Sequence, residues 1–140
     1  MKKQGVLNRE ISDVLARSGH MDTLCVCDAG FPIPLGVRTV DIALSDNNPG
    51  IIETLKEILK DFCVEKIILA EETKDTSPTM FSSILNLFDG IEVEVIKHAD
   101  FKIKSRDAKA IIRTGEFTCF SNVILVGGTD EKRWYRESSC

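Results

Sequence analysis

Apolar residues follow two periods along this chain, one typical of amphipathic helices and one typical of buried strands. Residues 8–18 carry three apolar side chains at helical spacing between an asparagine N-cap and Gly19, so we expect a helix there. The run 23–27 is short and almost wholly apolar, which favours a strand buried in a sheet. His20 precedes this strand and Asp28 follows it, so an imidazole and a carboxylate mark its two ends.

The remaining pattern predicts alternating strands and helices. Further strands are expected at residues 40–44, 66–70, 91–96, 108–112 and 122–126, and further helices at 48–62, 77–89 and 99–105. Asn48-Pro49 and Ser77-Pro78 are each interpreted as an N-cap followed by proline in the first turn of a helix. This alternation predicts the α/β class, as a three-layer α/β/α single domain with a largely parallel central sheet of about six strands.

Length and composition agree with one domain. A chain of 140 residues buries roughly two-thirds of its unfolded surface, which is enough for a core. We expect the domain to span residues 1–128 and a polar C-terminal extension to span residues 129–140. Two interpretations of this extension stay open: a disordered segment, because its composition buries little surface, or an arm whose Trp134 and Tyr135 dock on a neighbouring subunit.

The charge and the apolar pattern argue against nucleic-acid and membrane partners. The net charge is -4 and basic residues are scattered among acidic ones, so we expect no nucleic-acid partner. No apolar run approaches the roughly 20 residues that cross a bilayer, so we expect no membrane partner. The basic start, residues 1–5, is followed by no apolar signal core, and the five cysteines form an odd set. These features predict a cytoplasmic protein.

Polar residues stand where the predicted strands end. Asp28 follows the first strand, His98 follows the fourth, and the polar loop 113–116 follows the fifth. Small ligands bind at the carboxyl ends of strands in such sheets, so these residues are candidates for a binding site. Each also has a purely structural interpretation: His20 as a cation at a helix C-terminus, Asp28 as a turn former and His98 as a surface residue.

Motifs for nucleotides and metals are weak in this chain. Gly127-Gly128 follows a strand without the spacing, or the following helix, of a nucleotide-binding loop. The chain has no HExxH motif and no Cys/His pair at zinc spacing. A metal site remains conceivable from one set of residues: His20, Asp22, Asp28 and His98. We rank it low and expect no metal and no cofactor.

Six strings in order along residues 1–128 carry a family resemblance. They are Gly5-Val6-Leu7-Asn8, Gly19-His20-Met21-Asp22, Asp28-Ala29-Gly30-Phe31-Pro32-Ile33-Pro34, Asp41-Ile42-Ala43-Leu44, Ile112-Arg113-Thr114-Gly115-Glu116 and Asn122-Val123-Ile124-Leu125. Together they resemble the D-ribose pyranase family. The related L-fucose mutarotases share the Gly-His and Arg-Thr-Gly-Glu elements, whereas the Pro-Ile-Pro loop is more similar to the ribose branch.

The resemblance implies a cofactor-free isomerase that interconverts the pyranose and furanose forms of D-ribose and so feeds ribokinase. It implies His20 as the proton donor, and it implies sugar contacts at Asp28, His98, Phe120, Ser121 and Asn122. Phe120 and Ser121 depart from the family, which usually has tyrosine and alanine there. The resemblance also implies a homo-oligomer, a homodecamer of two pentamers. Two alternatives stay open: a mutarotase for another monosaccharide such as fucose, and a non-catalytic sugar-binding accessory protein.

The length of the predicted strand between His20 and Asp28 limits how close the two side chains can lie within one chain. Residues 23–28, if fully extended at about 3.3 Å per residue, span about 16 Å, and His20 lies beyond the far end. We do not expect a single subunit to place both side chains on the same sugar. We therefore expect a site shared by His20 of one chain and Asp28 of its neighbour.

Overall fold

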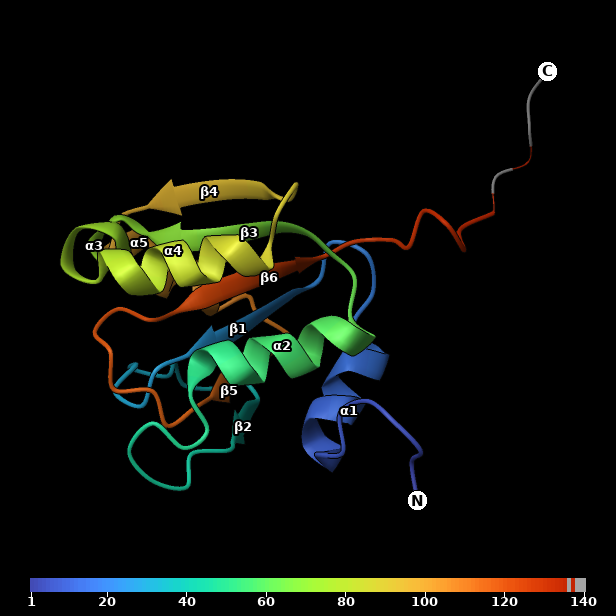
Figure 1. Ribbon diagram of the computed structural model, residues 1–140, viewed down its shortest axis with the longest axis horizontal. Coiled ribbons are helices and arrows are strands. Elements are labelled where there is room, and N and C mark those ends of the chain that lie inside the picture. The colour runs from blue at the N-terminus through green and yellow to red at the C-terminus, as the bar shows by residue number, and fades with distance from the viewer. Residues whose placement is uncertain (136, 138–140) are drawn as a thin grey trace.

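A six-stranded mixed sheet forms the centre of the computed structural model, which describes residues 1–135 and 137 (Figure 1). The strands lie in the order β2-β5-β1-β6-β3-β4. Their bounds are β1 Thr23–Cys27, β2 Thr39–Asp41, β3 Val64–Ala70, β4 Glu92–Ile96, β5 Ala110–Arg113 and β6 Val123–Gly127. Only β6 runs antiparallel to its neighbours, β1 and β3, and the other pairs are parallel.

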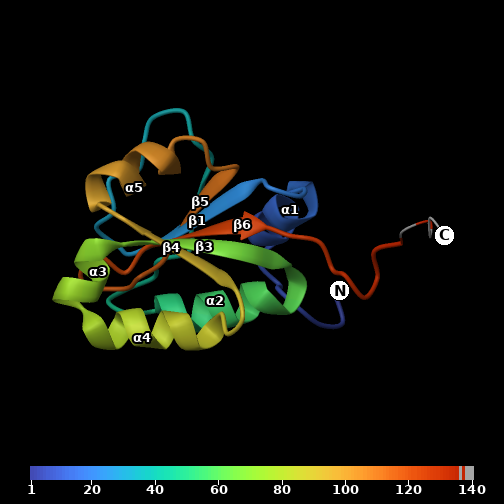
Figure 2. The same ribbon diagram turned by 90° about the horizontal axis from the view of Figure 1, so that it is seen from above.

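Helices cover both faces of the sheet. They are α1 Arg9–Arg17, α2 Ile51–Asp61, α3 Glu71–Thr76, α4 Pro78–Leu87 and α5 His98–Ser105. Figure 2 shows α5 on one side of the sheet and α2 and α4 on the other. Buried residues of α1, α2 and α4 share one core with alternate residues of β1, whereas α5 packs its Phe101 into a second core on the opposite face. The predicted three-layer α/β/α architecture is confirmed.

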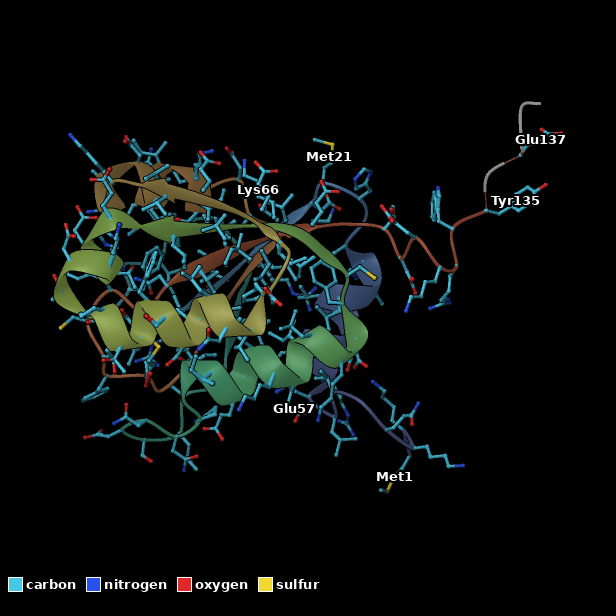
Figure 3. The ribbon with its side chains drawn as sticks, turned by 45° about the horizontal axis from the view of Figure 1, so that its top comes forward. Met1, Met21, Glu57, Lys66, Tyr135 and Glu137 are labelled. Carbon is cyan, nitrogen blue, oxygen red and sulfur yellow. The ribbon has the colours of Figure 1, made fainter. Side chains whose placement is uncertain are left out.

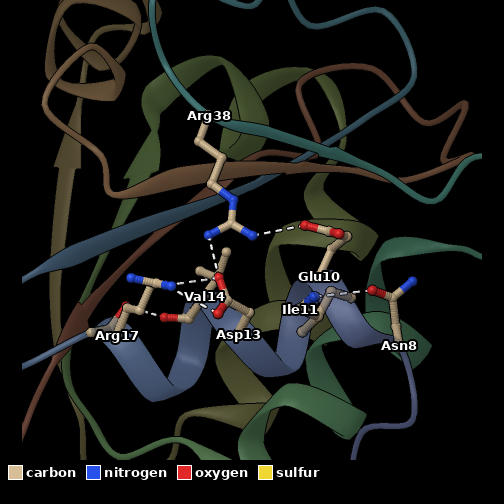
Figure 4. Close-up of polar contacts among 8 residues, drawn as sticks. Asn8, Glu10, Ile11, Asp13, Val14, Arg17 and Arg38 are labelled. Atoms are coloured by element: carbon tan, nitrogen blue, oxygen red, sulfur yellow. Dashed lines mark hydrogen bonds and ion pairs between the residues drawn. The ribbon is translucent and has the colours of Figure 1, made fainter.

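An ion-pair cluster fixes the segment before β2 to α1 (Figure 4). Arg38 donates to the carboxylates of Asp13 at 2.6 Å and Glu10 at 2.7 Å. Asp13 also accepts from Arg17, one turn along the helix. The predicted N-cap is present, since the Asn8 side chain accepts a hydrogen bond from the Ile11 N–H at 2.9 Å.

The two proline-based helix starts have different outcomes. Helix α4 begins at Pro78 with Ser77 as its N-cap residue, as predicted. The start predicted at Asn48-Pro49 is wrong, because α2 begins at Ile51 with Gly50 as its N-cap residue. Asn48 accepts from Leu44, and the Pro49 carbonyl accepts from the Gly115 N–H at 2.8 Å, so a loop contact takes the place of the first turn.

Two further elements differ from the prediction by more than two residues. Strand β2 ends at Asp41 rather than at residue 44, because Asp41 Oδ1 accepts from the Ala43 N–H in a local turn and Leu44 is exposed. Helix α3 was not predicted. Its six residues are mostly polar and have no apolar period, so the sequence carries no helical pattern there.

The described part of the extension after β6 forms one turn. The N–H groups of Arg133 and Trp134 both donate to the Asp130 carbonyl, and Trp134 and Tyr135 are exposed. Figure 3 shows Tyr135 and Glu137 projecting from the body of the molecule. Disorder of the extension stays a prediction, and residues 136 and 138–140 lie outside the described residues.

Residues 1–135 and 137 contain no helix with the length and apolar character that a bilayer crossing requires.

Candidate functional site

A pocket of about 510 Å³ opens at the edge of the sheet where β1, β4 and β5 end and β6 begins. Four of the residues predicted to bind sugar line it: Asp28, His98, Phe120 and Asn122. Asp28 follows β1 and His98 opens α5 after β4, as expected for ligands at strand ends. Asn122 reaches the same edge because β6 is antiparallel and begins there. A volume of this size is within the range of small-molecule sites.

Asp28 is half-buried, and two hydrogen bonds hold its backbone and its side chain. Its N–H donates to Asn122 Oδ1 at 2.9 Å, and its Oδ1 accepts from the Gly30 N–H at 3.0 Å. Burial raises the pKa of Asp28, while the N–H groups of Gly30 and Ser121 oppose that rise. The result is a fixed carboxylate that faces the pocket and can accept hydrogen bonds from hydroxyl groups.

The His98 ring is held by aromatic neighbours. The Phe120 ring lies nearly perpendicular to it with 5.0 Å between ring centroids, while Phe101 and Phe31 lie at 6.1 Å. Burial lowers the pKa of His98, and the nearby Lys102 charge lowers it further. The neutral form of the imidazole is therefore favoured at pH 7. Its buried Nδ1 has no hydrogen-bond partner among the described residues, so a ligand hydroxyl can fill that position.

The segment before β6 forms the rim of the pocket. Phe120 adopts a left-handed backbone conformation, with φ of 57°. Its carbonyl accepts from Thr73 Oγ1 at 2.6 Å, so the unpredicted helix α3 holds this turn in place. Ser121 is fully buried, and its Oγ has no partner within the part of the chain that the structure describes. Asn122 is also buried, and its amide fixes the turn at Asp28.

The loop Arg113–Glu116 fastens the floor of the pocket. Arg113 forms an ion pair with Asp41 at 3.0 Å and donates from Nε to the Ala29 carbonyl at 3.1 Å. Gly115 passes so close to the backbone of Ser45 and Asn48 that any side chain there would clash. The loop therefore fixes residues 28–30, which carry the carboxylate.

Nine residues that line the pocket were not among the predicted contacts, and they include Phe31, Arg113 and Glu116. Arg113 and Glu116 belong to a loop that the sequence marks as polar and close to a strand end. Glu116 is buried, and burial raises its pKa, with the charges of Asp28 and Glu53 adding to the rise. Phe31 lies in the Asp28–Pro34 string, but nothing in that string indicates contact with a histidine 67 positions later.

His20 lies at the opposite end of β1, away from this pocket. It lines a second hollow of about 480 Å³ together with Asp61, Arg133 and Trp134. Its Nε2 is 2.9 Å from Glu65 Oε2 at the start of β3. The strand between His20 and Asp28 is extended, so within one chain the two side chains face different pockets.

The same separation argues against a metal site formed by His20, Asp22, Asp28 and His98. His20 and Asp22 stand at one end of β1, whereas Asp28 and His98 stand at the other. Asp22 accepts from the Gly19 N–H and pairs with Lys109 at 3.3 Å. Across residues 1–135 and 137, no three His, Cys, Asp or Glu side chains converge in a way that could hold a metal ion.

Comparisons with known proteins agree with the resemblance in the sequence. D-ribose pyranase of Kosmotoga olearia is 47% identical over 131 residues, which cover 93% of this chain and 99% of that protein. D-ribose pyranase of Thermotoga maritima is 46% identical over 132 residues, covering 91% and 98%. The solved structure of Bacillus subtilis RbsD complexed with D-ribose matches with a TM-score of 0.90 at 40% identity, covering 92% of this chain and 98% of that one.

A more distant structure shares the fold alone. The fucose mutarotase of Streptococcus pneumoniae, solved with L-fucose, matches with a TM-score of 0.76 at 21% identity, covering 89% of this chain and 94% of that one. The model of the RbsD / FucU transport protein family matches residues 1–130, nearly the whole length of the chain. This chain belongs to the RbsD / FucU transport protein family.

Proposed function

We propose that this chain is a D-ribose pyranase, which interconverts the pyranose and furanose ring forms of D-ribose. The observation that carries the proposal is the full-length likeness to D-ribose pyranases, at 47% identity over 99% of one of them. The pocket supports it, because a carboxylate, an amide and the imidazole of His98, whose buried Nδ1 has no partner among the described residues, line a space suited to a small sugar.

The chemistry requires only proton transfer. The ring oxygen of ribopyranose gains a proton as its bond to C1 breaks, and the anomeric hydroxyl loses a proton to solvent as the aldehyde forms. Attack by a different hydroxyl on the aldehyde then closes the furanose ring, and the same proton movements run in reverse. We assign the proton donor role to His20, since an imidazole can both give and take a proton near pH 7.

The sugar contacts follow from the pocket. Asp28 and Asn122 bind sugar hydroxyls, His98 presents its ring, Phe120 forms the rim, and Ser121 contacts the sugar from its buried position between Phe120 and Asn122. The first four assignments are supported by positions around one pocket, and the assignment of Ser121, which is not among the lining residues, is supported by its buried Oγ without a partner among the described residues. Because His98 is neutral, its nitrogens can accept from or donate to hydroxyls without a buried charge.

We propose that each site is completed by two subunits, with His20 of one chain and Asp28 of its neighbour on the same sugar. The length of β1 supports this arrangement, because residues 23–28 at about 3.3 Å each span about 16 Å and His20 lies before the start of the strand. The half-exposed His20 ring is accessible to a neighbour. The assembly that we propose is a homodecamer of two pentamers.

We further propose that the enzyme acts in the cytoplasm, where furanose made from incoming ribose is supplied to ribokinase. The two reactions fit in sequence if the kinase takes the furanose form.

Exchange NMR on D-ribose tests the proposed activity. Saturation of a pyranose anomeric signal should transfer to the furanose signal faster with the protein present than without it. Binding of ribose without faster exchange would contradict the enzyme and support a sugar-binding protein. Faster exchange of L-fucose anomers than of ribose forms would instead make the chain a mutarotase for another sugar.

Replacing Phe120 by tyrosine should speed the exchange. The two side chains have the same shape, so the left-handed turn and the contact with His98 are retained. The new phenolic hydroxyl can bond a sugar oxygen, and one such bond is worth about 0.5–1.5 kcal/mol, or about two- to tenfold in rate or affinity. The measurement is the ribose exchange rate constant of Phe120→Tyr beside the parent, with Phe117→Tyr on the same rim as the control. Equal rates for Phe120→Tyr and the parent would contradict a sugar contact at this position.

A further inference from the structure

The carboxylate of Glu65 is the nearest charged partner of His20. Glu65 Oε2 lies 2.9 Å from His20 Nε2, although 45 positions separate the two residues in the chain. Both side chains are half-exposed, at 51% for His20 and 42% for Glu65. Exposed pairs of this kind contribute little to stability, so a stabilising role alone does not explain the contact.

A break in the sheet directs Glu65 toward His20. In the antiparallel pairing of β3 with β6, Val64 is opposite Gly127 and Lys66 is opposite Val126, so Glu65 is an extra residue in a β-bulge. A bulge changes the direction of the strand and of the side chain that it carries, and bulges are common beside active sites.

The pair Gly127-Gly128 lets three segments meet at this point. A Cβ on Gly127 would lie 2.7 Å from the Gly19 carbonyl, and a Cβ on Gly128 would lie 3.0 Å from Glu65 Cβ. The glycines therefore allow β6 to pass between the turn that carries His20 and the bulge that carries Glu65. This packing gives the Gly-Gly sequence a structural role that has no connection with nucleotide binding.

The turn that carries His20 is itself fixed on both sides. The Met21 N–H donates to the Gly127 carbonyl at 2.8 Å, and the Gly127 N–H donates to the Asp22 carbonyl at the same distance. Asp22 also accepts from the Gly19 N–H, which closes the turn. The backbone of His20 is thus anchored to β6, and only its ring orientation depends on a side-chain partner.

We propose that Glu65 is a positioning residue for His20, a role that rests on the proposed function. Its carboxylate accepts a hydrogen bond from the Nε2–H of the neutral ring, so Nδ1 stays free to take a proton. The protonated ring then gives the Nδ1 proton to the ring oxygen of the sugar. A carboxylate that holds one nitrogen of a histidine in this way fixes both the tautomer and the direction of the ring.

Two substitutions test the pairing on the intact oligomer. Glu65→Ala removes the acceptor and should lower the ribose exchange rate constant about tenfold, part of the 10²–10⁴ that acid–base catalysis typically provides. Ribose affinity should stay within about twofold and the melting temperature should be nearly unchanged, because the pair is half-exposed. Glu65→Gln keeps an acceptor oxygen and should recover part of the lost rate.

The matched control is Glu57→Ala on α2, which removes a similar surface pair. Glu57 is 54% exposed and pairs with Lys60 at 2.7 Å. Figure 3 labels Glu57 on α2. This variant should exchange ribose forms at the parental rate. A Glu65→Ala variant as fast as the parent, or a Glu57→Ala variant as slow as Glu65→Ala, would overturn the positioning role.

A measurement that does not use activity separates this proposal from the proposed function. In ¹⁵N-edited NMR of the parent, the neutral His20 ring should carry its proton on Nε2, protected from exchange with water, and Glu65→Ala should lose that protection. A proton on Nδ1 in the parent, or equal protection in both proteins, would overturn the pairing. Absence of ribose exchange in the parent would instead overturn the proposed function.

Discussion

Replacing His20 by alanine is expected to slow the exchange between ribopyranose and ribofuranose by about 10²–10⁴-fold, the usual contribution of a general acid–base group. The imidazole lies in a half-exposed position with one side-chain contact, so its loss should leave the fold intact. Ribose affinity should change little, because Asp28, His98 and Asn122 face the other pocket of the chain. The measurements are saturation-transfer NMR for the rate and calorimetry for the affinity.

Arg17→Ala is the control for this prediction. Arg17 is 69% exposed on α1 and lines neither pocket, so its removal should leave the exchange rate at the parental value. Added imidazole should restore part of the exchange rate that His20→Ala loses. It should not change the rate of the parent protein. An alanine variant that exchanges ring forms as fast as the parent would remove His20 from the mechanism.

Replacing Asp28 by asparagine is expected to weaken ribose binding by about 10- to 100-fold. The asparagine side chain keeps an oxygen to accept from the Gly30 N–H, and the backbone N–H of residue 28 still donates to Asn122 Oδ1, so the turn should be preserved. What the variant loses is the charge, and hydrogen bonds to charged groups are worth about 1.5–3 kcal/mol. Calorimetric titration with D-ribose gives the affinity directly.

Asp89→Asn serves as the matched control, since Asp89 is exposed in the turn after α4 and remote from the pocket. It should bind ribose like the parent. The melting temperature of Asp28→Asn should be no lower than that of the parent, because burial raises the pKa of Asp28 and its ionised form is therefore disfavoured in the folded state. Unchanged affinity in Asp28→Asn would exclude this carboxylate from sugar binding.

The layered fold could be predicted because each layer has a period of its own. The run 23–27 becomes β1, and Ser77-Pro78 marks the start of α4. The antiparallel direction of β6 could not be predicted, since the apolar pattern of residues 123–127 does not indicate which strands pair with it or in which direction. Helix α3 was missed because its residues satisfy tertiary contacts, such as Thr73 with the Phe120 carbonyl, rather than an apolar period.

The site was predictable where a residue follows a strand directly. Asp28 and His98 meet at one pocket because the carboxyl ends of their strands share an edge of the sheet. The aromatic neighbours of His98 and the contact between Glu65 and His20 depend on pairs distant in sequence, for which a single sequence carries no pattern. The strand length nevertheless indicated correctly that His20 and Asp28 of one chain face different pockets.

Mixed assemblies of the two impaired variants, assayed at a ribose concentration that does not saturate Asp28→Asn, test the shared site most directly. His20→Ala and Asp28→Asn chains are co-expressed with different tags, and assemblies that carry both tags are purified and assayed for ribose exchange. If each site takes His20 from one chain and Asp28 from its neighbour, random mixing leaves about a quarter of the sites intact, and activity should return to about a quarter of the parental value. Activity no higher than that of the two variants assayed separately would contradict a site completed by two subunits.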